Sequence, residues 1–212
     1  YKKKPSKINW TSKFIMDTKI CGVKDLYTLN YILNHKHPPK FIGFITNYPN
    51  SRRYIEHEDL KKLINIDKKK INFVSVLVNP NNEILEKIKN FNFDYYQLYD
   101  VDPVKTKIIK EKYKVKIITA ITIENKIDVK KYKKFESISE IILFDSKGYE
   151  KSVSFNHELL NDVPSSLKKM IAGNIKIEDI SNFKNMDYII DLSGALEDEN
   201  GQKDIKKIDK FL

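Results

Sequence analysis

Two side chains in this sequence could move protons, because each lies at the end of a short apolar run. Cys21, the only cysteine, follows "TKI", and as a thiolate helped by the nearby Lys19 it could act as a base or a nucleophile. Asp145 ends the run "EIILFD", where partial desolvation raises the proton affinity of a carboxyl group and suits a general acid. Each also has a structural explanation, since a buried thiol behaves as a small hydrophobe and an aspartate often orders a loop.

The two arginines form a second candidate site. The chain has 39 lysines and arginines together, and only Arg52 and Arg53 are arginines. A guanidinium group offers a planar fork of donors that binds carboxylates in a way that lysine cannot reproduce. If lysine has replaced arginine wherever arginine was dispensable, the segment "NSRRYI" marks where a guanidinium fork is needed.

Glycines follow the last two apolar runs of the chain. Gly173 ends "KKMIAG" and Gly194 ends "DYIIDLSG". If these runs are the last two strands of an α/β barrel, the loops after them commonly bind phosphate through backbone N–H groups, although the glycines could also serve turns alone. The four histidines have no zinc-ligand spacing and are predicted to lie on the surface: His35, His37, His57 and His157.

The elements that would position these side chains are eight strands. Short β-branched, apolar runs are typical of buried parallel strands, and each candidate above lies at or just beyond the C-terminal end of one. The runs occupy residues 18–22, 40–45, 71–78, 95–99, 116–123, 140–145, 168–173 and 187–194.

Segments with helical spacing separate the runs. Asn81, and Asp102 before Pro103, suit helix starts. Strict alternation predicts a parallel α/β sheet, and eight units predict a single closed (β/α)8 TIM barrel over residues 16–212, preceded by a polar extension at 1–15. The predicted helices occupy residues 25–35, 56–66, 81–91, 102–113, 128–135, 155–163, 176–183 and 204–212.

Composition limits the choice of partners. The formal net charge is +10, but acidic residues are interleaved with lysine throughout, so we favour a solvated surface over a polyanion-binding patch and expect no nucleic-acid partner. No apolar run approaches the roughly 20 residues of a membrane span. A single cysteine fits a reducing compartment, so we expect a cytoplasmic protein without membrane association.

The order of motifs resembles that of the phosphoribosylanthranilate isomerase family, whose members are (β/α)8 barrels of tryptophan biosynthesis. The resemblance covers residues 18–212. It is carried by "KICG" (19–22), "GF" (43–44), "NSRRYI" (50–55), "VLVN" (76–79), "QLYD" (97–100), "LFDSK" (143–147), "IAGNI" (171–175) and "DLSGALEDENGQKD" (191–204).

The resemblance implies an Amadori rearrangement of a phosphorylated aminoaldose to an aminoketose, by acid–base catalysis without a metal or organic cofactor. It implies that Cys21 is the base and Asp145 the acid. It also implies that Arg53, just before Tyr54, contacts the anthranilate end of the substrate, while Arg52 is a bystander. The remaining implied contacts are Gln97 and Asp191 to the substrate, and Gly173, Asn174, Ser193 and Gly194 to its phosphate.

Several positions depart from the family pattern. Tyr99 stands where the family usually has histidine, the glycine-rich loop after the sixth strand is altered, and Asn174 and Ala195 replace glycines. Asparagine tolerates a positive φ, whereas alanine there would be strained. Two alternatives therefore stay open: a non-catalytic phosphate-ligand-binding paralogue, and an isomerase of another phosphorylated aminosugar. The sequence is compatible with a monomer or a homodimer.

Overall fold

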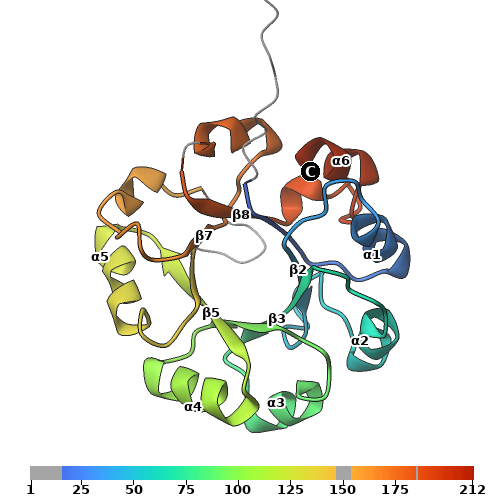
Figure 1. Cartoon of the computed structure of the whole chain (residues 1–212), viewed down its shortest axis with the longest axis horizontal. Coiled ribbons are helices and arrows are strands. Elements are labelled where there is room, and N and C mark those ends of the chain that lie inside the picture. Colours follow the sequence, from blue (N-terminus) through green and yellow to red (C-terminus); the bar gives the residue numbers. More distant parts are fainter. Residues whose placement is uncertain (1–15, 147–153, 185) are drawn as a thin grey trace, which may run out of the picture.

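Eight parallel strands close into a barrel in chain order, with β1 hydrogen-bonded to both β2 and β8 (Figure 1). This computed structural model describes residues 16–146, 154–184 and 186–212, so the predicted extension at 1–15 and most of the altered loop after the sixth strand lie outside it. The predicted TIM barrel is confirmed. Its strands are β1 Thr18–Cys21, β2 Phe41–Ile45, β3 Asn72–Val78, β4 Tyr95–Tyr99, β5 Lys116–Ile123, β6 Ile141–Ser146, β7 Lys169–Ile171 and β8 Tyr188–Leu192.

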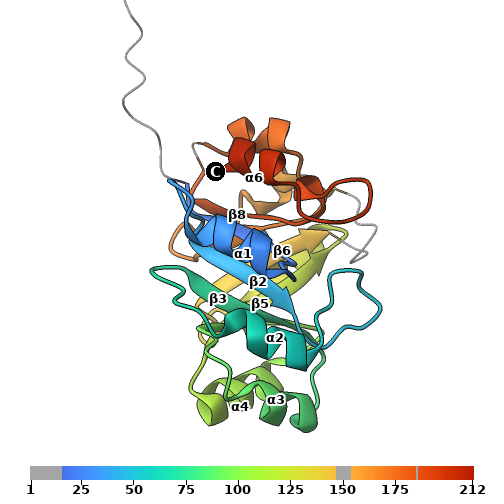
Figure 2. The ribbon, with the colours of Figure 1, turned by 90° about the vertical axis from the view of Figure 1, so that its right-hand side faces the viewer.

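Helical segments surround the barrel, as the side view shows (Figure 2). The predicted starts are confirmed, because the side chains of Asn81 and Asp102 accept hydrogen bonds from backbone N–H groups of the first helical turn. No helix within the described ranges is long and apolar enough to cross a bilayer. The α-helices are α1 Leu26–Leu33, α2 His57–Ile64, α3 Asn82–Ile88, α4 Pro103–Tyr113, α5 Lys126–Val129 and α6 Ile205–Phe211.

Three predicted helices are wrong in type. The segment predicted at 128–135 is one short turn, α5, followed by the 3-10 helix η1 (Lys130–Lys134), and the other two are 3-10 helices, η2 (His157–Leu160) and η3 (Ile177–Phe183). The 3-10 segments are short, from four to seven residues, and 3-10 helices occur mainly as short pieces. Only η3 also contains Asp, Ser and Asn, which favour caps and turns over helix interiors. A further 3-10 turn, η4 (Gly194–Leu196), follows β8.

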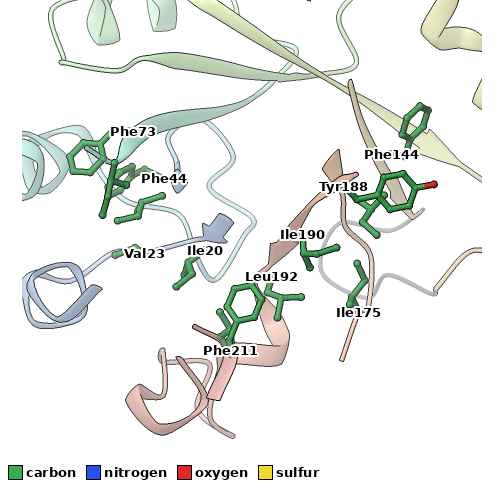
Figure 3. Close-up of a cluster of buried hydrophobic side chains, with 14 of the residues drawn as sticks. Ile20, Val23, Phe44, Phe73, Phe144, Ile175, Tyr188, Ile190, Leu192 and Phe211 are labelled. Carbon is green, nitrogen blue, oxygen red and sulfur yellow. The ribbon is translucent and has the colours of Figure 1, made fainter. Parts of the chain in front are cut away.

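The core has two layers, because alternate strand residues face opposite sides of the sheet. Ile20, Phe44, Phe144 and Ile190 point outward and pack beneath the surrounding helices (Figure 3). The inward-facing residues fill the barrel, among them Phe41, Val74, Tyr95, Ile118, Leu143, Met170 and Ile189. The same alternation turns the last inward residue of several strands toward the barrel mouth.

Candidate active site

A pocket of about 460 Å³ opens at the carboxyl ends of the strands, a volume suited to a small-molecule ligand. The structure brings together every predicted site residue, since all of them line this one pocket: Cys21, Arg53, Gln97, Asp145, Gly173, Asn174, Asp191, Ser193 and Gly194. Tyr99 and Arg52 line it as well. The roles of the predicted site residues remain predictions. Their common location follows from strand direction, because the carboxyl ends of all eight parallel strands and the loops after them lie at one end of the barrel.

Asp145 is a carboxyl group held ready for proton transfer. Its Oδ2 accepts a hydrogen bond from the Tyr99 hydroxyl at 2.7 Å, and its Oδ1 accepts one from the backbone N–H of Ser146 at 2.8 Å. Burial raises the pKa of Asp145 to about 6, against the lowering effect of the Tyr99 hydrogen bond, while the charge of Asp191 adds to the rise. The group can therefore change its protonation state near neutral pH.

Cys21 lies at the end of β1, opposite Gly43 of β2. A Cβ atom at Gly43 would lie 2.9 Å from the Cys21 Sγ and 3.0 Å from the Lys19 Nζ, so glycine makes room for both groups. Burial raises the pKa of the Cys21 thiol above its usual value of 9.0, and the Lys19 charge opposes this rise only in part. The pocket thus holds a thiol, with a cation beside it that favours the thiolate.

An ion pair beneath the thiol joins the first and last strands. Lys19 is fully buried, and its Nζ donates to Asp191 Oδ2 at 2.8 Å. Burial lowers the pKa of Lys19, but its interactions with Asp191 and Cys21 outweigh this effect and raise the pKa, so the ammonium group stays charged. The other carboxylate oxygen, Asp191 Oδ1, is buried without a hydrogen-bond partner among the described residues.

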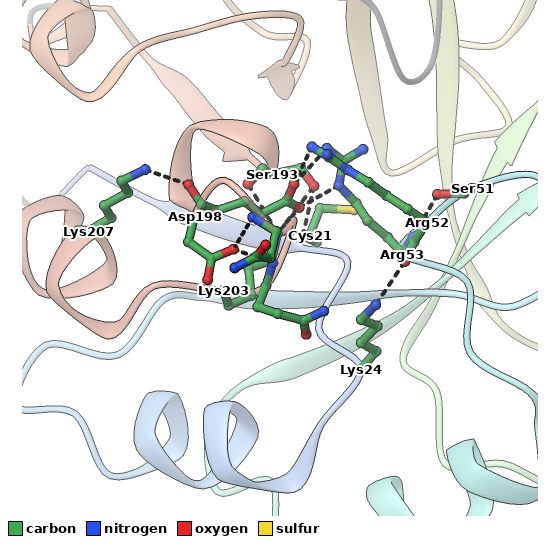
Figure 4. A network of polar contacts seen from close by, with 12 residues as sticks. Cys21, Lys24, Ser51, Arg52, Arg53, Ser193, Asp198, Lys203 and Lys207 are labelled. Atoms are coloured by element: carbon green, nitrogen blue, oxygen red, sulfur yellow. Dashed lines mark hydrogen bonds and ion pairs between the residues drawn. The ribbon is translucent and has the colours of Figure 1, made fainter.

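Both arginines are anchored to one acidic residue that was not predicted, Glu197. Figure 4 labels the two arginines and Lys203 within this network of polar contacts. Arg53 is buried and binds the Glu197 carboxylate through Nε at 2.5 Å and Nη2 at 3.0 Å. Arg52 donates to it at 2.7 Å with a half-exposed side chain, and Lys203 donates at 2.9 Å. Burial would raise the pKa of Glu197, but these cations lower it to about 2.

A signal for Glu197 does exist in the sequence. It is an acidic residue in the loop after the last strand, and the only two arginines of the chain lie in the loop after another strand of the same barrel. Loops at one end of a barrel meet, so a permanent negative charge there is a candidate partner for them.

Two glycines make room for Arg53. A Cβ at Gly22, whose φ is +78°, would lie 2.7 Å from Arg53 Cδ, and one at Gly194 would lie 3.2 Å from Arg53 Nη2. Gly194 therefore lies against the guanidinium group of Arg53 and is also part of the predicted phosphate-binding loop after β8.

The loop after β7 contains the positive φ angles that were expected for the predicted phosphate loop. Gly173 has φ +95° and Asn174 has φ +51°, so asparagine does adopt the left-handed conformation that we expected it to tolerate. Ala195 is not among the described residues with positive φ and lies in the turn η4, so its replacement of glycine brings no such strain. Ser193 donates from Oγ to the Cys21 carbonyl at 3.0 Å, which ties the loop after β8 to β1.

The prediction that all four histidines lie on the surface fits His37, which is exposed, whereas His35, His57 and His157 are half-buried. The His157 ring packs between Phe155 and Phe183, with centroid distances of 4.6 and 5.0 Å, and burial lowers its pKa. Among the described residues, no group of three or more His, Cys, Asp or Glu side chains could hold a metal ion.

A family model and two relatives that are at least 30% identical point to the same family. A family model described as N-(5'-phosphoribosyl)anthranilate (PRA) isomerase matches residues 18–212. The N-(5'-phosphoribosyl)anthranilate isomerase of Campylobacter jejuni is 32% identical, with 93% of this chain and 98% of that protein covered. The corresponding enzyme of Rhizobium rhizogenes is 30% identical, with 92% of each covered.

Solved structures share the fold. The phosphoribosyl anthranilate isomerase of Thermotoga maritima has a TM-score of 0.80 at 23% identity, covering 92% of this chain and 96% of its own. A phosphoribosyl anthranilate isomerase in complex with reduced 1-(o-carboxyphenylamino)-1-deoxyribulose 5-phosphate has a TM-score of 0.78 at 22% identity, with the same coverage.

Proposed function

This chain belongs to the N-(5'-phosphoribosyl)anthranilate isomerase family, and on that premise we propose that it catalyses the family's Amadori rearrangement. The substrate is N-(5-phosphoribosyl)anthranilate and the product is 1-(2-carboxyphenylamino)-1-deoxyribulose 5-phosphate, in tryptophan biosynthesis. One observation carries the proposal: a carboxyl group with a pKa of about 6 and a thiol beside a buried ammonium group line the same pocket.

Asp145 performs the first proton transfer. It gives its proton to the furanose ring oxygen, the bond from that oxygen to C1' breaks, and the anthranilate nitrogen lone pair forms an iminium bond to C1'. The carboxylate that remains is stabilised by the donors on its two oxygens, Tyr99 and the Ser146 N–H. A pKa near 6 leaves a useful fraction of Asp145 protonated at neutral pH.

Cys21 performs the second proton transfer. Its thiolate removes the proton from C2', and the electron pair left behind forms an enolamine, which tautomerises to the ketone product. Lys19 favours the thiolate because its charge lies beside Sγ and is held there by Asp191. Catalysis by a free thiol requires that the cysteine stays reduced, which supports a cytoplasmic location.

The polar groups around the pocket suit the rest of the substrate. We assign Arg53 to the anthranilate carboxylate, since Glu197 fixes the orientation of its guanidinium group. Asp191 Oδ1 and Gln97 Oε1 are buried acceptors without a hydrogen-bond partner among the described residues, and a ligand N–H or O–H would remove that penalty. They suit the substrate amine and a ribose hydroxyl, respectively.

The phosphate is assigned to the loops after β7 and β8. Consecutive positive φ values at Gly173 and Asn174 suit a concave backbone whose N–H groups face an anion. Ser193 and Gly194 line the other side of this part of the pocket, and the nearby Lys176 adds a positive charge. A phosphate held away from the reacting bonds supplies binding energy without taking part in the chemistry.

A fluorescence assay for the consumption of phosphoribosylanthranilate tests the proposal. Cys21→Ser and Asp145→Asn should each lower kcat by two orders of magnitude or more while circular dichroism stays unchanged, because each removes one proton transfer at about that worth. Arg52→Lys is the control, at the rim of the same pocket. Near-normal rates in both variants would disprove the mechanism. A folded wild-type protein that fails to rescue a tryptophan auxotroph lacking this step would instead favour a non-catalytic phosphate-binding role.

A further inference from the structure

Tyr99 is the last residue of β4, and its hydroxyl connects two other side chains of the pocket. It donates to Asp145 Oδ2 at 2.7 Å, across the intervening strand β5. It also accepts a hydrogen bond from Gln97 Nε2 at 3.3 Å. Gln97 lies two residues earlier on the same strand, so both side chains face the barrel interior. All three residues line the pocket.

The direction of these hydrogen bonds follows from the groups themselves. An amide NH2 only donates, so Gln97 uses a lone pair of the Tyr99 oxygen and leaves the single hydroxyl hydrogen to point elsewhere. Asp145 Oδ2 is the acceptor in reach. Burial raises the pKa of the Tyr99 phenol well above 10, so the hydroxyl stays protonated and keeps donating. A neutral donor of this kind stabilises the carboxylate form of Asp145 and not the protonated form.

We propose that Tyr99, aimed by Gln97, is a positioning residue that sets the proton affinity of Asp145. The Tyr99 hydroxyl stabilises the charge that appears on Oδ2 when the acid gives up its proton, and Gln97 keeps the hydroxyl hydrogen directed there. The consequence for catalysis rests on the function proposed above, whereas the effect on the protonation of Asp145 does not depend on it.

Among the described groups that face Asp145, the Tyr99 hydroxyl is the one that hydrogen-bonds Oδ2 and stabilises a negative charge there. Asp191 on β8 is negative and raises the pKa of Asp145, as burial does. Lys19 on β1 lowers it, but that charge is already engaged by Asp191. The Ser146 N–H bonds the other oxygen, Oδ1. Cys21 is a neutral thiol at neutral pH, because burial raises its pKa. Tyr99 is thus the described side chain that donates to Oδ2.

A carboxyl titration tests the proposal directly. The full chain is labelled with aspartate carrying ¹³C in the side-chain carboxyl, and the Asp145 resonance is assigned by its loss in Asp145→Asn. We expect Tyr99→Phe to raise the midpoint for Asp145 by about one pH unit, the effect of losing one hydrogen bond to a charged group. Gln97→Met should raise it by less, because the hydroxyl then loses only its direction.

Tyr95→Phe is the matched control, because Tyr95 is another inward-facing tyrosine of β4, at the opposite end of the strand from Tyr99. It should leave the Asp145 midpoint unchanged. An unchanged or lowered midpoint in a folded Tyr99→Phe protein would overturn the proposal. If Tyr99→Phe does not fold, an unchanged midpoint in Gln97→Met overturns it, and a raised midpoint supports it.

The pH profile of turnover separates this proposal from the proposed function. With isomerase activity present, the acidic limb of kcat/KM should move to higher pH in Tyr99→Phe, together with the carboxyl midpoint. A shifted midpoint in a protein without isomerase activity would support the role of Tyr99 and reject the proposed function. Isomerase activity with an unshifted carboxyl midpoint and an unshifted acidic limb in Tyr99→Phe would support the proposed function and reject the role of Tyr99.

Discussion

At the scale of single residues, two groups decide how the proposed reaction depends on pH. Burial raises the pKa of Asp145 to about 6 and that of Cys21 above 9.0. The working form carries the proton on Asp145 and has lost it from Cys21, which is the reverse of the order in which the two groups ionise. Between the two pKa values its population is constant, because protonated Asp145 declines with rising pH as fast as the thiolate grows.

We therefore expect kcat/KM to rise with pH up to about 6, to stay level, and to fall only above pH 9. Below pH 6 the carboxyl group is already protonated, so further acid only removes thiolate. Above the thiol pKa, further base only removes the proton of Asp145. Initial rates in a constant-ionic-strength buffer series check the profile. A kcat/KM that increases as the pH is lowered below 6 would contradict these assignments.

The two arginines should differ although they share Glu197. Arg53 is buried and holds the carboxylate with two nitrogen atoms, whereas the Arg52 side chain is half exposed. Arg53→Lys should lower kcat/KM by about tenfold or more, because lysine cannot reproduce the two-pronged geometry. Arg52→Lys should change it little. Equal losses from the two substitutions in steady-state kinetics would remove the reason for assigning Arg53 to the substrate.

At the scale of elements, the contact between β1 and β2 depends on a missing side chain. Gly43→Ala would place a methyl group 2.9 Å from Sγ of Cys21 and 3.0 Å from Nζ of Lys19, so one of the two must move. We expect a lower kcat with a nearly unchanged KM, because the substitution separates thiol and cation without touching the phosphate loops. Steady-state kinetics check this, with thermal unfolding as the control for the fold. An unchanged kcat would show that the Lys19 charge does not assist the thiolate.

The strands could be predicted because their signal is local, whereas other features depend on distant parts of the chain. β4 and β5 match the predicted residues, since tyrosines make up most of β4 and β-branched residues most of β5, and both residue types favour strands. The 3-10 helices could not be predicted, because a helical period over so few residues does not distinguish i→i+3 from i→i+4 bonding. Cys21 and Asp145 could be placed from strand direction alone. For Glu197 the sequence offers only a candidate, an acidic residue in the loop after the last strand, because tertiary contacts across irregular loops decide which acidic residue meets the arginines.

At the scale of the whole molecule, the positive charge is dispersed. Many lysines pair with acidic residues on the same or a neighbouring element, such as Lys87 with Glu83 and Lys110 with Glu140. This arrangement agrees with the solvated surface expected from the sequence. Exposed pairs of this kind contribute little to the free energy of unfolding.

Glu197 should matter more for stability, because its carboxylate is buried among three cations. Its pKa falls from 4.5 to about 2 on folding, so its contribution is fully present above pH 4.5 and is lost as pH falls from 4.5 toward 2. Glu197→Gln should lower the free energy of unfolding at neutral pH by roughly 1–2 kcal/mol, after allowance for solvent screening, and should weaken its dependence on acid. Urea unfolding at several pH values checks this, with Glu83→Gln as the control that should change little. A variant that loses stability in acid as steeply as the parent would contradict this account.

The buried pair of Lys19 and Asp191 joins residues 172 positions apart, one from the first strand and one from the last. A ribosome therefore makes the lysine long before its partner. Until β8 emerges, an ammonium group that is fully enclosed in the finished barrel has no counter-ion, and enclosing it alone would be strongly unfavourable. Nascent chains that stop before β8 should therefore leave β1 exposed to water and to chaperones, and the barrel should close only when translation has supplied its final strand.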